Sequence, residues 1–82
     1  MKYYVMTIEQ IKGETEGTYN EYAGAKKYND EQSAMVYFYQ RCSEVANALG
    51  KTHVYMDIKI VNSLGGVTKK DQIGTYVEPE AE

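Results

Sequence analysis

His53 is the only histidine of the 82-residue chain and the side chain best suited to acid–base or metal chemistry near neutral pH. Either role needs partners. The nearest acid in sequence, Asp57, falls on the same predicted strand face without being adjacent. One histidine without a pair of cysteines makes a poor zinc site. We therefore expect a surface or interface histidine, and no catalytic or metal-binding residue.

Gly50, Lys51 and Thr52 resemble the end of a phosphate-binding loop. The earlier glycine of that motif would fall at Val45, so it is missing. A helix also precedes the three residues, whereas phosphate binding needs a strand that leads into the start of a helix. The pattern instead predicts the end of a helix, where a glycine takes the left-handed conformation.

Four glutamates surround the first predicted turn, and paired carboxylates can do acid–base work or bind calcium. Their spacing does not follow a calcium-binding loop, and no serine stands in the context of an activated nucleophile. We expect a solvated acidic end, no enzyme and no cofactor. The four residues are Glu9, Glu14, Glu16 and Glu21.

Cys42 is the only cysteine, so no internal disulfide can form. It falls on the apolar stripe of a predicted helix, which favours a small buried hydrophobic residue over a reactive thiol. The first residues show no signal-peptide pattern, and no apolar run approaches the roughly 20 residues of a membrane span. We expect a cytoplasmic protein that does not contact a membrane.

The net charge of −3 comes from nine basic and twelve acidic residues. Glu78, Glu80 and Glu82 lie among the last five residues, and the rest of the chain is neutral. A neutral body lacks the basic field that supplies nucleic-acid affinity, so we expect no direct nucleic-acid binding. We predict one domain over residues 1–77 and an acidic, flexible tail over residues 78–82.

A helix is predicted from Asn29 to Gly50, and it is the element that positions the candidate residues above. Its apolar residues recur at steps of three and four, which is the period of one helix face. Asn29 and Asp30 are both good N-caps, and Gly50 suits the C-terminal end. The apolar stripe consists of Ala34, Phe38, Cys42, Val45 and Leu49.

Strands are predicted on both sides of the helix. The first reads as a central strand, the second as short and irregular with a bulge or close contact at Gly24, and the fourth as interrupted near Lys70. The order is strand, strand, helix, strand, strand, which predicts an α+β two-layer sandwich with a four-stranded antiparallel sheet. The predicted strands span 3–11, 18–28, 53–61 and 67–77.

One face of this sheet has no helix to cover it. The third strand alternates clearly and should place Val54, Met56, Ile58 and Ile60 against the helix. The chain also has nine tyrosines, a residue type common in half-buried surfaces and interfaces. We expect an interface on the uncovered face, formed by Tyr3, Val5, Thr7, Tyr55 and Val61.

The chain resembles a group of small phage and prophage proteins of Firmicutes in its opening KYYVMTIEQIKG, in the run YNDEQSAMVYFYQ and in its alternating strand with a glycine turn. Tyr28, Ala34, Phe38 and Gly66 match that pattern, whereas Tyr39 stands where those proteins often carry a histidine. The resemblance implies a phage or prophage setting, and it transfers no active site to this chain.

Taken together, the sequence predicts a non-enzymatic protein-interaction module, homodimeric, from a phage or mobile element. Its partner would be a second copy, a host protein, or both. Two alternatives stay open. One is a phage-encoded inhibitor of a host nucleic-acid enzyme or defence system. The other is a small-ligand-binding domain that uses the gap between helix and sheet.

Overall fold

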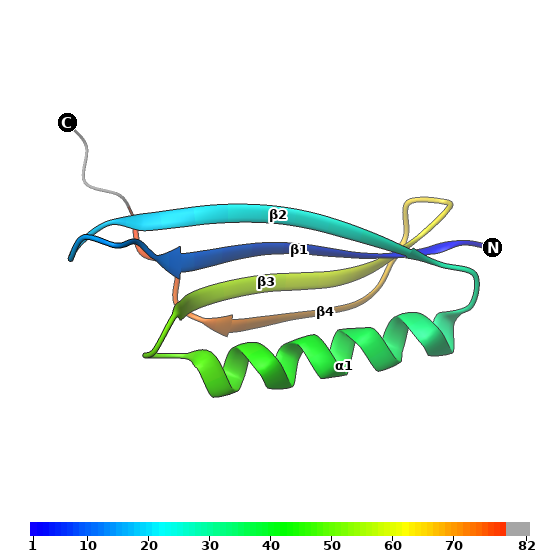
Figure 1. The fold of residues 1–82 in the computed structure, drawn as a ribbon. Coiled ribbons are helices and arrows are strands. Elements are labelled where there is room, and N and C mark those ends of the chain that lie inside the picture. Colours follow the sequence, from blue (N-terminus) through cyan, green and yellow to red (C-terminus); the bar gives the residue numbers. More distant parts are fainter. Residues whose placement is uncertain (79–82) are drawn as a thin grey trace.

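The computed structural model describes residues 1–78. In this part of the chain, a four-stranded antiparallel sheet carries one helix on one face (Figure 1). The predicted α+β two-layer sandwich and its β-β-α-β-β order are thereby confirmed, and the strands lie in the order β2-β1-β3-β4. The elements are β1 (Tyr3–Lys12), β2 (Tyr19–Tyr28), α1 (Glu31–Ala48), β3 (His53–Asn62) and β4 (Val67–Gly74).

The helix α1 begins and ends at residues that satisfy its free backbone groups. Of the two predicted caps, Asp30 is the N-cap, and its side chain accepts a hydrogen bond from the Ser33 N–H at 2.8 Å. Gly50 has a φ of 79°, the left-handed conformation predicted for it. The buried residues of α1 pack against the sheet, and the core consists of Val5, Ala34, Phe38, Val45, Met56, Ile58 and Ile60.

Strand β2 is longer and more regular than predicted. All ten of its residues pair with β1 without a shift in register. Gly24 forms no bulge. It lies opposite Thr7, and a Cβ at Gly24 would come within 3.2 Å of the Thr7 hydroxyl oxygen. The glycine therefore fits a close cross-strand side chain, whereas the sequence predicted a bulge or a close backbone contact.

Strand β4 is uninterrupted, and it ends at Gly74 rather than at Val77. The pairing of β3 with β4 continues through Lys70 and Asp71, where an interruption was predicted. Gly74 has a φ of 76°, which turns the chain out of the sheet.

The residues after β4 cross the sheet face that has no helix. The side-chain amide of Gln10 donates to the Val77 carbonyl oxygen at 2.6 Å, and its oxygen accepts from the Val77 N–H at 2.8 Å. The ring of Tyr76 stands edge-on to that of Tyr55, with 5.4 Å between centroids. These contacts bury Gln10 and fix the segment onto the sheet. Residues 79–82 of the predicted tail lie outside the described residues.

The face of β1 that meets the helix is the opposite of the one predicted. Val5 lies opposite Ile60, and Thr7 lies opposite Ile58. Residues directly opposite each other in an antiparallel pair share a face. Since Ile58 and Ile60 are fully buried beneath α1, Val5 and Thr7 are buried with them.

The predicted interface is therefore divided between the two faces of the sheet. Tyr3 packs against the helix-covered core together with Val5 and Thr7, so the prediction was wrong for these three residues. Tyr55 and Val61 alternate with the buried residues of β3 and lie on the helix-free face, where both are half-buried.

Candidate functional site

The helix-free face of the sheet, called the open face below, carries a shallow hollow of about 210 Å³. Its floor is β1, where Met6 and Ile8 are 41% and 42% exposed although both are large and apolar. On the β2 side, Ala23 and Gly24 are small and leave the hollow open. On the β3 side, Asp57 and Lys59 form its border. The hollow is lined by Met6, Thr7, Ile8, Ala23, Gly24, Asp57 and Lys59.

The apolar floor of this hollow was assigned to the wrong side by sequence reasoning. Met6 and Ile8 are bulkier than Val5 and Thr7, which favoured them for the core. Only the register with β3 reveals that they face away from α1. Glu9 favoured the wrong assignment as well, because a carboxylate on the face of Val5 and Thr7 suggests that this face meets solvent.

A second cluster joins Glu9 of β1, Arg41 of α1 and His53 of β3. The Glu9 carboxylate accepts a hydrogen bond from the Arg41 guanidinium, and the same oxygen, Oε1, lies 2.9 Å from His53 Nε2. Thr52 Oγ1 lies 3.2 Å from the other ring nitrogen of His53. The side chains of Glu9 and His53 are each 14% exposed, so the cluster closes one end of the space between helix and sheet.

Electrostatics favours the charged form of the Arg41 guanidinium in this cluster. Partial burial alone would lower the pKa of the Arg41 guanidinium, but the charges and hydrogen bonds of Glu9 and Glu44 outweigh burial and raise that pKa. Both ring nitrogens of His53 are engaged by Glu9 and Thr52, and the cluster lines none of the hollows described here. The arrangement ties three elements together, which is a structural role.

The predicted acidic end is therefore split. Glu9 faces the helix, and Glu21 accepts a hydrogen bond from the Tyr76 hydroxyl at 3.3 Å on the open face. Glu14 and Glu16 remain exposed in the turn, as expected for solvated acids. Within residues 1–78, no group of three or more histidine, cysteine, aspartate or glutamate side chains is arranged to hold a metal ion.

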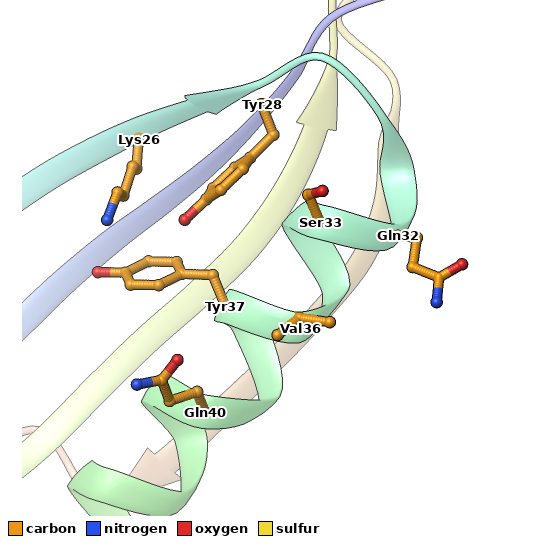
Figure 2. Close-up of a pocket in the computed structure, with 7 residues that line it drawn as sticks. All are labelled: Lys26, Tyr28, Gln32, Ser33, Val36, Tyr37 and Gln40. Carbon is orange, nitrogen blue, oxygen red and sulfur yellow. The ribbon is translucent and has the colours of Figure 1, made fainter.

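A groove of about 370 Å³ lies between the edge strand β2 and the first half of α1 (Figure 2). Tyr28 points from the strand toward the helix, and Tyr37 extends from the helix toward the strand, with 5.9 Å between ring centroids. The ammonium group of Lys26 lies 4.7 Å from the centroid of the Tyr37 ring. The groove is lined by Lys26, Tyr28, Gln32, Ser33, Val36, Tyr37 and Gln40, and it contains no carboxylate.

Comparison of the chain with protein-family models, with curated proteins and with solved structures finds no match. Among the described residues, α1 is not apolar enough to cross a membrane. Any functional conclusion must therefore come from the surfaces themselves, of which the open face and the β2 groove are the two candidates.

Proposed function

We propose that this chain is a non-enzymatic protein-interaction module of a phage or mobile element, and that it forms a homodimer through the open face. The phage setting is supported by the sequence resemblance alone. The dimer is supported by one observation, which is that the charges and apolar residues of the open face are complementary to themselves.

The pattern follows from the register of the sheet. One row across the strands contains Ala25, Met6 and Lys59, and the next row contains Ala23, Ile8 and Asp57. Two outer rows flank these central rows. One contains Lys27 opposite Tyr4, and the other contains Glu21 opposite Gln10. Lys59 and Lys27 are thus matched by Asp57 and Glu21 in the rows related to theirs through the centre. Lys70 of β4, beside Lys59, is matched by the neutral Gln72.

Consider a two-fold axis that lies on the open face, perpendicular to the strands, between the row of Met6 and the row of Ile8. This axis places each of these two rows over the other row of the second copy. It would place Met6 of one copy over Ile8 of the other, and Lys59 over Asp57. At the edge, Lys27 would lie over Glu21. Such an interface has an apolar centre and charged surroundings, and one patch serves both subunits, as two-fold symmetry requires.

The test is a charge swap read by sedimentation velocity. Asp57→Lys and Lys59→Asp should each weaken the dimer by about tenfold, because each places like charges opposite one another. The double variant Asp57→Lys/Lys59→Asp restores opposite charges across the axis and should recover dimerisation. Glu16→Lys, in an exposed turn, is the matched control and should have no effect.

A wild-type protein that is monomeric at high micromolar concentration would contradict the homodimer. So would a double variant no stronger than the single ones. A monomer would leave the open face to a foreign protein, as the inhibitor alternative requires. The small-ligand alternative has less support, because Phe38, Met56 and Ile58 fill the space between helix and sheet.

A further inference from the structure

The outer edge of β2 is a free, regular strand edge. β2 is the first strand in the sheet order, and residues 20–27 are all exposed. It has neither a bulge nor a proline, two of the devices that block strand addition, and its two lysines, Lys26 and Lys27, lie near one end of the strand. Its middle is formed by Ala23, Gly24 and Ala25, the smallest side chains available, so little shields the backbone.

The hydrogen-bond pattern identifies the backbone groups that point outward. The Gly13 N–H donates to the Thr18 carbonyl oxygen at 2.8 Å beside the turn, and the Lys12 N–H points the other way, to Thr52 at 2.8 Å. Bonded and non-bonded pairs alternate along an antiparallel ladder. The odd-numbered residues of β2, including Ala23, Ala25 and Lys27, therefore direct their N–H and C=O groups away from β1.

A strand added at this edge would place alternate side chains on its two faces. Those on the helix side would enter the groove of Figure 2 beside Lys26. Within residues 1–78, Lys26 has no ion-pair partner, and the groove offers the tyrosine hydroxyls as further donors. Those on the other side would lie against Ala23 and Ala25, beside the apolar hollow of the open face.

We propose that the β2 edge binds an extended segment of another protein as a fifth strand, and that this segment alternates acidic side chains, which enter the groove, with apolar ones, which cover Ala23 and Ala25. A second copy of β2 does not fit this requirement. Its helix-side residues are Asn20, Tyr22, Gly24, Lys26 and Tyr28, which include no acid. The inference does not rest on the homodimer, because it depends on the free backbone edge of β2, although Ala23 and Ala25 border both surfaces.

The first experiment is a titration of a fluorescein-labelled peptide that alternates glutamate with valine by the 82-residue chain, followed by fluorescence anisotropy. The counterpart that alternates lysine with valine is the control and should bind at least about tenfold more weakly. Lys26→Glu should reverse this preference, whereas Lys27→Glu, on the open face, should change it less. Equal binding of the two peptides, or no binding of either, would overturn the proposal.

The second experiment tests strand addition itself by amide hydrogen exchange. Bound peptide should slow the exchange of the outward amides, those of Ala23, Ala25 and Lys27, while the inward amides of Gly24 and Lys26 stay as protected as before. Ala25→Pro removes one outward donor without touching the ladder to β1, and it should abolish binding while far-ultraviolet circular dichroism is unchanged. Binding without protection of the outward amides would overturn the proposal.

Discussion

Glu9 shows how one side chain joins three elements of this fold. Its carboxylate is the common partner of Arg41 on the helix and His53 on the neighbouring strand. The three side chains are partly buried, so their hydrogen bonds stabilise the fold more than those of an exposed pair would. Solvent still screens them in part.

Glu9→Gln should therefore lower the free energy of unfolding by about 1–2 kcal/mol, because it removes the charge that Arg41 and His53 share. Glu16→Gln, in the exposed turn, is the matched control and should stay within about 0.5 kcal/mol of wild type. Chemical denaturation followed by circular dichroism measures both. Equal stability of the two variants would mean that the cluster contributes nothing.

Cys42 lies half-buried beside two opposite charges on β4. Burial raises the pKa of its thiol, Asp71 raises it further, and Lys69 opposes them. A raised pKa means less thiolate at pH 7, so Cys42 should react with iodoacetamide more slowly than glutathione does.

The two neighbouring charges supply matched variants for this prediction. Asp71→Asn should lower the thiol pKa and speed the reaction, whereas Lys69→Gln should raise the pKa and slow it, each by more than about twofold. The measurement is the rate of alkylation by mass spectrometry as pH is varied. Rates that change in the same direction in both variants would refute the electrostatic cause.

At the scale of elements, Gly74 is the residue that ends β4. Its φ of 76° costs any other residue about 1–2 kcal/mol, and a Cβ at this position would also collide with the Val54 carbonyl oxygen. Gly65 has a similar φ of 85° but open space around it, so the two glycines separate backbone strain from steric collision.

Gly65→Ala should thus cost only the strain, about 1–2 kcal/mol, and Gly74→Ala clearly more. Gly74→Ala should also loosen the segment that follows it, which heteronuclear NMR would detect as altered signals of Tyr76 and Val77. If the two variants melt at the same temperature, the collision at Gly74 is relieved by a small backbone movement.

The elements differ in how far sequence could predict them. β3 alternates more clearly than β1, and three of its four residues predicted against the helix, Met56, Ile58 and Ile60, are buried there. The fourth, Val54, is only half-buried. β1 is apolar on both faces, and alternation cannot then choose a side. The pairing with β3 makes that choice, and a shift of one residue would reverse it. β2 was judged irregular from Gly24 and its neighbours, but its partner strand overrides this weak propensity.

The Glu9 cluster was missed for a related reason. Alternation placed His53 with Tyr55, away from the helix. In the structure, the register between β1 and β3 shifts after Gln10, so that Ile11 lies opposite His53 instead of Val54. Such an irregularity redirects a side chain, and here it brings His53 to Glu9. The pattern within one strand cannot predict where its pairing with the neighbouring strand changes register.

At the scale of the whole molecule, the Cα atoms extend over only 16 Å in the thinnest direction, against 43 and 27 Å in the other two. A slab of two layers has one side of its sheet without a second layer, and the segment after Gly74 covers only the end of it near Gln10. The proposed dimer and the proposed added strand use the remaining face and the β2 edge. The two surfaces meet at Ala23 and Ala25, so the two partners would be neighbours there.

The strand order has a consequence for how the chain is made. β1 and β2 are joined by a short turn, as are β3 and β4, but the two hairpins meet only through β1 and β3, where Tyr3 pairs with Asn62. On the ribosome, β1, β2 and α1 emerge first, with the apolar side of the helix half covered and the inner edge of β1 unpaired. The molecule is completed only when its last third arrives, and that long-range closure should limit the rate of folding.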